Sequence, residues 1–273
     1  MKRALILLAV PAVLQVSSAS FEREGEGARI AALGGAGVAL PGDPWGFLIN
    51  PACSMPARAR SIGFVHAPSS FGLRELSRSG FVCLESGALG SIAVSGIRFG
   101  FDLYRELSFG LSFGAEIAPG FRAGAAVHFF RITIQGYGSA WTLGTDVGLL
   151  WAPSGDVQIG FTATNVNAPA IGRAREKLPQ TIGVGTAYAP FPGLLVVCDL
   201  VKDIRFPPEL RFGIEYSPVE PVALRAGAGR DPSTFGGGLG IALDLLVLDY
   251  SVVRHEALGF THRIGVTVRL GDD

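Results

Sequence analysis

Gly110, Ser112 and Gly114 match the G-x-S-x-G pattern that carries the nucleophilic serine of many hydrolases. That chemistry needs a strand, a sharp turn and then a helix, so that the serine hydroxyl stands clear of the sheet. Here Ser112 lies inside a run that alternates apolar and small residues, and no helical pattern follows it. We therefore expect a strand residue without a catalytic role. A hydrolase built on a barrel stays open as an alternative, and a serine within hydrogen-bonding reach of a histidine would favour it.

The other residue types that could do chemistry are scattered. The four histidines, His66, His128, His255 and His262, include no H-E-x-x-H pair, and the carboxylates lack the spacing of a metal-binding loop. No complete G-x-G-x-x-G pattern precedes a helix, so a nucleotide site is not indicated. We expect no catalytic residue, no metal and no cofactor.

Charged residues do recur on one face of alternating runs, opposite the apolar face. Mixed charges of this kind are costly in lipid but are accepted in a wet or internally paired lumen. They predict either salt bridges that tie an internal segment to a wall or a polar path for a substrate. The candidate lumen-lining residues are Asp146, Asp199, Arg211, Glu215, Arg225, Asp249, Arg263 and Arg269.

The elements that would position these residues are strands, because apolar residues alternate with small or polar ones at a period of two. In 209–216, for example, Leu210, Phe212 and Ile214 share one face. Turn residues such as Pro, Gly, Ser and Asp separate the runs. The predicted strands are 61–69, 76–85, 88–99, 104–117, 120–134, 139–152, 156–166, 179–189, 193–203, 208–217, 220–230, 234–243, 245–254 and 259–270.

Composition indicates what the strands face. The chain has 273 residues and no net charge, from 23 basic and 23 acidic side chains. Charged residues make up 17% of it, against roughly 25% in an average soluble protein. Lysine occurs only at positions 2, 177 and 202, whereas glycine occurs 38 times. This composition excludes a disordered tail, a collagen and a nucleic-acid-binding arm, and it predicts a surface that faces something other than water.

The first residues indicate export. Residues 1–19 have a basic start at Lys2 and Arg3, an apolar core and small residues before Ala19, which is the layout of a signal peptide cleaved after Ala19. No later stretch has the roughly 18 uncharged apolar residues of a membrane helix. Since only helices and closed barrels satisfy every backbone group in lipid, an apolar exported chain points to a transmembrane β-barrel in an outer membrane.

A soluble β-sandwich would also alternate, but two features favour the barrel. The polar face is mostly Gly, Ser and Thr rather than long charged side chains. Trp141 and Trp151 bracket one apolar face, at the separation of the aromatic girdles of a membrane barrel. We therefore predict an all-β fold, an antiparallel transmembrane barrel of about 14 strands over residues 61–273. Residues 20–60 do not alternate and form a separate N-terminal segment.

Both ends of the chain resemble a known family. The run from Ala31 to Ala39, with Gly34, Gly35 and Gly37, is followed by Asn50, Pro51 and Ala52, and near the C-terminus come Leu248-Asp249-Tyr250 and Thr261-His262-Arg263. These stretches resemble PorV/PorQ-type outer-membrane proteins and, more distantly, FadL-type transporters of hydrophobic compounds. The resemblance implies a fourteen-stranded barrel whose N-terminal segment enters the lumen as a plug. Residues Gly34, Gly35, Gly37, Asn50, Pro51 and Ala52 would then be the plug motif.

The resemblance leaves two functions open, neither of them enzymatic. The family reading is a PorV/PorQ-type barrel that acts in secretion or transport across the outer membrane, with secretion-system proteins as partners. The alternative is a FadL-like channel for small hydrophobic molecules. In both cases the surrounding partner is outer-membrane lipid, and nucleic acid is not a partner.

One further feature is a change of phase in the run 90–99. Ile92 and Val94 occupy one face, whereas Ile97 and Phe99 occupy the other, and the change falls at Ser95-Gly96. Glycine inside a strand commonly marks a bulge or kink. We therefore expect a kink at Ser95 and Gly96, which either only shifts the register or opens a side exit from the lumen into lipid.

Overall fold

The structure is a computed structural model that describes residues 20–23, 25–53, 55, 58–230 and 232–270. The predicted signal peptide, residues 1–19, lies outside the described residues. Among the described residues, no helix is long and apolar enough to cross a membrane.

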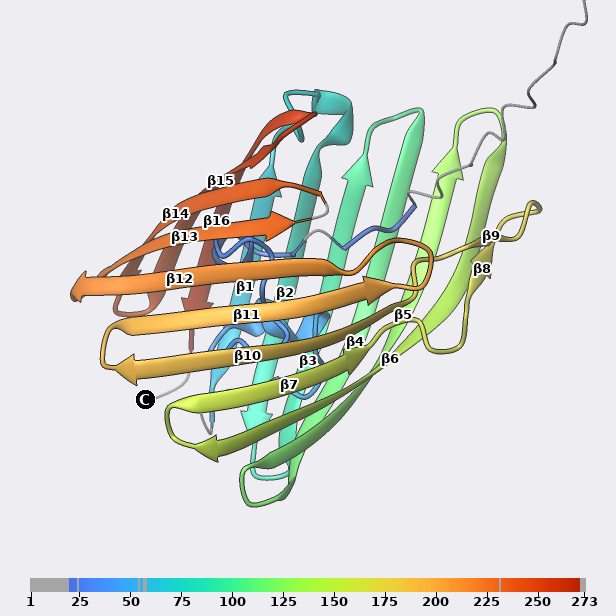
Figure 1. The fold of residues 1–273 in the computed structure, drawn as a ribbon. Helices are drawn as coiled ribbons and strands as arrows, with labels where there is room; N and C mark the ends of the chain where they lie inside the picture. Colours follow the sequence, from blue (N-terminus) through green and yellow to red (C-terminus); the bar gives the residue numbers. More distant parts are fainter. Residues whose placement is uncertain (1–19, 24, 54, 56–57, 231, 271–273) are drawn as a thin grey trace, which may run out of the picture.

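Fourteen antiparallel strands in the described part of the chain form one closed barrel (Figure 1). They are β1 (Arg60–Ala67), β2 (Arg78–Gly87), β3 (Gly90–Gly100), β4 (Tyr104–Ala118), β5 (Phe121–Ile134), β6 (Gly138–Ser154), β7 (Val157–Ala163), β10 (Thr181–Phe191), β11 (Leu194–Asp203), β12 (Glu209–Val219), β13 (Val222–Arg230), β14 (Thr234–Leu243), β15 (Leu246–His255) and β16 (Gly259–Arg269). Each strand pairs with its neighbour in the chain, and β1 pairs with β16 to close the wall. The predicted fold class and strand number are confirmed.

The two ends of the barrel differ in their connections. At one end every connection between consecutive strands is a turn of two residues, such as 88–89 and 119–120. At the other end, which we call the upper end, the connections include 68–77 and 164–180. The second of these holds a small ribbon of β8 (Ala170–Ile171) and β9 (Glu176–Lys177), and it is the reason why β7 ends at Ala163, earlier than predicted.

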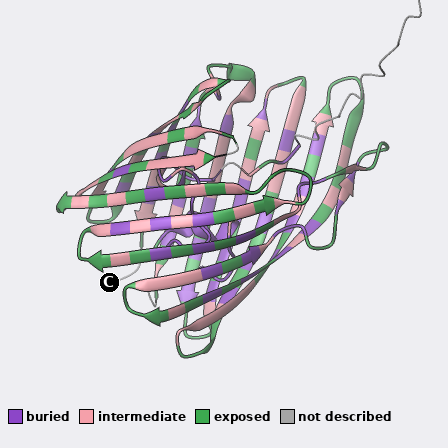
Figure 2. Ribbon diagram, in the orientation of Figure 1, coloured by how far each residue is buried: buried purple, intermediate pink, exposed green. Residues whose placement is uncertain are grey.

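Buried and exposed residues alternate along the wall strands (Figure 2). Large apolar side chains point outward and small or polar ones inward, as the sequence indicates. On β6 the outward residues include Trp141, Leu143, Val147 and Trp151, all of them exposed, whereas the inward Asp146 is buried. An outward surface of this composition suits lipid rather than water.

The N-terminal segment lies inside the barrel, where Figure 1 shows it in blue. It contains a short helix α1 (Ala28–Ala32) and a 3₁₀ helix η1 (Pro44–Leu48). Asp43 begins η1 as an N-cap, since its side chain accepts the N–H of Trp45 at 2.9 Å. The segment supplies most of the core: Ile30, Leu33 and Phe47 are almost completely buried together with wall residues of β1 and β2.

The expected kink at Ser95 and Gly96 is wrong. β3 pairs without interruption with β2 from Phe99 to Gly90, and with β4 from Gly100 to Ser91. The strand keeps its alternation, and Ile97 and Phe99 point inward, where they line the lumen together with Phe21 and Phe130. The guanidinium of Arg78 lies over the ring of Phe99. Gly96 points outward, where a methyl group would collide with the ring of Phe81. The change of apolar face therefore arises because Ile97 and Phe99 line the lumen, and not because the strand is broken. The paired wall has no side exit at this position.

Candidate functional site

Inward-facing wall glycines receive the backbone of the N-terminal segment. A methyl group at Gly213 would lie 2.7 Å from the carbonyl oxygen of Leu33, and one at Gly236 would lie 2.8 Å from that of Ala31. Such close approach of two backbones is possible only where the wall has no side chain. At Gly148 and Gly185 the nearest atoms of the segment are side-chain atoms, of Asn50 and Val38. We call the inward wall glycines that face the segment the glycine band: Gly114, Gly124, Gly148, Gly160, Gly185, Gly213, Gly227 and Gly236.

Asn50, Pro51 and Ala52 lie against this band on the side of β4 to β6. The Asn50 amide nitrogen donates to the carbonyl oxygens of Val38, at 2.8 Å, and of Leu149 on β6, at 3.1 Å. Its amide oxygen accepts the N–H of Ala52 at 3.0 Å. Asn50 is fully buried, so these bonds satisfy backbone groups that water does not reach.

Gly34, Gly35 and Gly37 lie against the opposite side of the wall. Gly34 and Gly35 have φ values of +70° and +80°, and a side chain at Gly34 would collide with the backbone of β13. The N–H groups of Gly37 and Val38 both donate to one carboxylate oxygen of Asp199 on β11, at 2.6 and 2.9 Å. The six residues of the predicted plug motif thus contact the inner wall directly.

Asp146 joins three parts of the chain. Its carboxylate accepts Arg23 Nη1 from the N-terminal segment at 2.5 Å, and it accepts the N–H of Asn165 from the β7–β10 connection at 2.8 Å. His128 Nε2 on the neighbouring β5 lies 2.9 Å from the same carboxylate. Asp146 is only 2% exposed, so its charge is compensated by these neighbours rather than by water.

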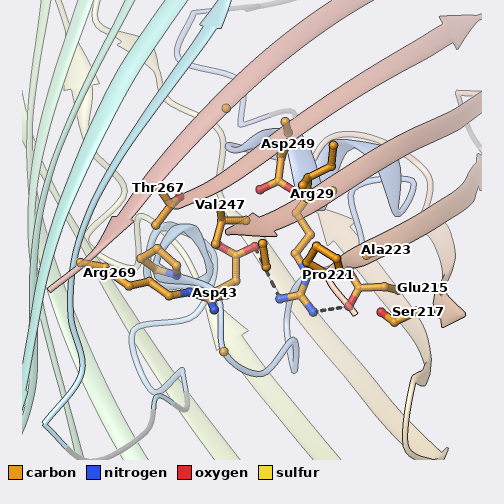
Figure 3. A pocket seen from close by; sticks show the side chains of 18 of the residues that line it. Arg29, Asp43, Glu215, Ser217, Pro221, Ala223, Val247, Asp249, Thr267 and Arg269 are labelled. Atoms are coloured by element: carbon orange, nitrogen blue, oxygen red, sulfur yellow. Dashed lines mark hydrogen bonds and ion pairs between the residues drawn. The ribbon is translucent and has the colours of Figure 1, made fainter. Parts of the chain in front are cut away.

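A cavity of about 500 Å³ opens at the lower end of the lumen (Figure 3). Arg29 of α1 reaches into it and donates from Nε and Nη2 to the two oxygens of Glu215, each at 2.7 Å. Arg225 donates to Glu215 at 2.5 Å and to Asp249 at 2.6 Å. Two guanidiniums and two carboxylates therefore form a buried network that connects the N-terminal segment to β12, β13 and β15.

Asp43 extends this network toward the lower mouth. Its carboxylate lies 3.8 Å from Arg29 Nη1. Burial raises the pKa of the Asp43 carboxyl above its usual range, although Arg29 and the N–H of Trp45 act in the opposite direction.

A second cavity, of about 690 Å³, lies at the upper end of the lumen. The apolar part of its lining includes Phe71, Val201, Phe206, Val253 and Leu258. Charged residues line the rest, among them Asp203, Glu209, Arg211 and Arg263. Its floor is formed by the N-terminal segment, and the residues there are Ala31, Gly34 and Gly35. The same segment thus forms the floor of the upper cavity and, through Ala28 and Arg29, part of the wall of the lower one.

The remaining predicted lumen residues lie at the two cavities. Arg211 lines the upper cavity and donates to the carbonyl oxygen of Gly35 at 3.2 Å. Arg263 also lines the upper cavity, and it donates to the carbonyl oxygen of Gly25 at 3.5 Å. Arg269 lies at the lower mouth, where it is exposed.

Several polar contacts were not anticipated from the sequence. Arg23 and Arg29 belong to the N-terminal segment, which has no alternation to place them on a face, and both pair with wall carboxylates. Arg78 of β2 forms the reverse pair, with the carboxylate of Glu26 in the N-terminal segment. No signal in the sequence pointed to these partners, because the eight predicted lumen residues, four acidic and four basic, were already balanced among themselves.

The geometry offers little support for a hydrolase. Ser112 is buried inside β4, and its hydroxyl donates to the carbonyl oxygen of Phe47 at 3.4 Å. In the part of the chain that the structure describes, one Ser–His hydrogen bond joins Ser79 Oγ and His66 Nδ1 at 2.9 Å, but it lies on the outward face of β1 and β2. Within the described residues no carboxylate forms an ion pair with His66, and no group of His, Cys, Asp and Glu could hold a metal ion.

No family model and no curated protein matches the chain. Among solved structures, it is similar to the CymD monoaromatic hydrocarbon channel, with a TM-score of 0.70 and 12% identity over 91% of this chain and 98% of that one. It is also similar to the Pseudomonas putida toluene transporter TodX (TM-score 0.62, 12% identity, 91% and 98% coverage). A FadL homologue of Pseudomonas aeruginosa gives a TM-score of 0.60 at 12% identity, with 89% and 98% coverage.

These similarities define the class of structure, a closed fourteen-stranded barrel with the fold of FadL-type channels. Two of the three structures are described as a channel or a transporter, and none as an enzyme. The PorV/PorQ resemblance is not confirmed.

Proposed function

We propose that this protein is an outer-membrane channel for small hydrophobic molecules. The observation that carries the proposal is the upper cavity of about 690 Å³, which has an apolar part formed by residues such as Phe71, Val201 and Val253. It lies inside a barrel of apolar outward surface. Apolar concave sites of this size bind small molecules by burying most of their surface.

The orientation follows from the connections. Bacterial outer-membrane barrels have short periplasmic turns and longer outer loops. The upper end therefore faces outside the cell and the two-residue turns face the periplasm. In this orientation the upper cavity meets molecules that arrive from the medium, and the predicted signal peptide accounts for export.

The N-terminal segment acts as the plug. An apolar molecule in the upper cavity contacts Ala31, Gly34 and Gly35. Below these residues, the N-terminal segment packs against the glycine band and fills the lumen. Passage requires part of this segment to move, since its backbone approaches the wall too closely to leave a path. The buried pairs of Arg23 with Asp146 and of Arg29 with Glu215 hold it in the closed position.

The similar structures support a hydrophobic substrate, since CymD is described as a monoaromatic hydrocarbon channel and TodX as a toluene transporter. At 12% identity they support it by fold alone. The reading as a secretion component has no comparable observation in its favour, so the hydrophobic channel is the better supported of the two.

The test is uptake of radiolabelled toluene by cells that express the protein, compared with cells that carry the empty vector. Val253→Asp places a charge in the apolar lining and is expected to lower uptake about tenfold or more, because a carboxylate repels an apolar solute and retains water. Val253→Ile keeps the lining apolar and is the matched control. Equal toluene uptake with and without the protein would overturn the proposal.

A further inference from the structure

Three arginines occupy the outward face at the upper ends of neighbouring strands. Arg98 of β3 and Arg131 of β5 both lie opposite Leu107 of β4, one on each side. Arg105 lies two residues from Leu107 on the same face of β4. Since adjacent strands are about 4.8 Å apart, the three guanidiniums emerge from a patch about 10 Å wide. We call Arg98, Arg105 and Arg131 the arginine patch.

The positive charge of the patch is poorly compensated. Among the described residues, Arg98 and Arg131 form no ion pair, and Arg131 donates only to the hydroxyl of Ser139, at 3.4 Å. Arg105 has one carboxylate, that of Asp102 at 3.4 Å, which is 92% exposed and therefore well hydrated. The outward acid of the neighbouring β2, Glu85, lies near the lower end, where it pairs with Arg60. The patch is thus available to an anion from outside the chain.

The surface directly below the patch is apolar. Phe109 on β4 and Val94 on β3 are exposed on the outward face. Trp141 of β6 lies opposite Arg131, is 64% exposed, and stacks on Phe129 with ring centroids 5.8 Å apart. Tryptophan and arginine gather where apolar lipid meets its head groups, so this level marks the boundary of the apolar belt.

We propose that the arginine patch binds the phosphate of an anionic lipid, whose acyl chains lie on the apolar surface of β3 to β6 below it. Guanidinium groups suit phosphate because their planar N–H groups pair with two of its oxygens. Free phosphate is a poor occupant, since the patch is an open surface with no cavity to exclude water. A lipid also buries apolar surface in the same binding event. The inference rests on the membrane location in the proposed function, but not on the transported molecule.

The test uses the purified full-length protein in detergent, with bound lipid counted by native mass spectrometry. The probes are lipid A, phosphatidylcholine and inorganic phosphate. The test variant is the triple change R98Q, R105Q and R131Q. The control variant, K202Q with R230Q and R254Q, removes three outward cations from the upper ends of β11, β13 and β15.

We expect wild type and the control variant to bind lipid A alike, and the test variant to bind it roughly 100-fold more weakly, because each basic residue contributes to attraction of anionic lipid. Equal binding by both variants would overturn the proposal, as would equal affinity of the wild type for phosphatidylcholine. Full competition by millimolar inorganic phosphate would overturn it too, since that would show a phosphate site without a lipid component. Toluene uptake is measured on the same variants. If cells with the wild-type protein take up no more toluene than cells with the empty vector while lipid A still binds, the channel proposal fails and the lipid site stands.

Discussion

The guanidinium of Arg29 lies against the carboxylate of Glu215, with two N–H groups donating at 2.7 Å each. The two residues are far apart in the chain, one on the short helix α1 and the other on the wall strand β12. Arg225 shares the same carboxylate and also pairs with Asp249. The N-terminal segment is therefore fixed by a network of charged side chains. Removing one of these side chains changes the electrostatic energy of the others.

Removal of Arg29 and removal of Glu215 are expected to destabilise the protein by different amounts. Arg29→Ala leaves Glu215 paired with Arg225, so we expect a loss of about 1–3 kcal/mol in the free energy of unfolding. Glu215→Ala leaves Arg225 paired with Asp249, but Arg29 loses its bidentate partner and keeps the more distant carboxylate of Asp43, at 3.8 Å. Because two largely buried cations then share less negative charge, a loss of about 3–5 kcal/mol is expected. The free energy of unfolding is measured by urea titration in lipid vesicles, with tryptophan fluorescence as the signal.

The control for this series is Arg60→Ala. Arg60 pairs with Glu85 at the exposed lower rim, where both side chains are more than half exposed, and its loss is expected to cost less than about 1 kcal/mol. An equal effect of Arg29→Ala and Arg60→Ala would show that the internal network does not hold the segment.

The glycine band gives a second prediction. Gly227 faces inward, and a methyl group there would collide with the backbone of Leu33 and Gly34, so Gly227→Ala is expected to cost about 1–3 kcal/mol or to displace the segment. Gly237, on the neighbouring strand β14, faces outward and has no atom closer than 3.9 Å to an added methyl group. Gly237→Ala is therefore the matched control.

The readout for this pair is the urea midpoint together with limited proteolysis of the N-terminal segment. Faster cleavage in Gly227→Ala alone would support close packing of segment and wall. Equal stability and equal cleavage of the two variants would contradict it.

Much of the wall could be predicted from the sequence because a membrane barrel repeats one physical rule along every strand. Alternation of Leu210, Phe212 and Ile214 with small or charged residues fixes both the strand and its outward face. The same rule failed at Ser95 and Gly96, since a change of apolar face has two causes. Either the strand bulges or apolar side chains point into the lumen, and only the pairing of β3 with its neighbours distinguishes the two causes.

The contacts of the N-terminal segment could not be predicted in the same way. Asp199 and Asp146 were placed on an inward face, but their partners, Gly37 and Arg23, lie more than a hundred residues away. Which partner is used depends on how a segment without periodicity folds inside the lumen. The glycine band was visible only as a glycine-rich face, because its purpose depends on the backbone that lies against it.

Closure of the barrel predicts heat-modifiable migration on SDS gels. The wall has no free edge, since β1 pairs with β16 along six residue pairs, and detergent therefore has no strand to peel away without heating. Unheated protein is expected to run as a compact band that shifts on boiling. Recovery of the mature protein in the soluble periplasmic fraction without detergent would instead contradict the membrane location.

Deleting residues 21–57 is expected to leave a folded barrel with larger conductance in planar bilayers. The strands begin at Arg60 and close by their own hydrogen bonds, whereas the deleted segment fills the lumen against the glycine band. The double variant R29A with D199N keeps the whole segment but removes two of its fixations to the wall, and an intermediate conductance with frequent opening is expected from it. Heat-modifiable migration serves as the folding check for each variant. If the deletion abolishes that migration, the segment is part of the core that the barrel needs to fold, and its role as a movable plug is excluded.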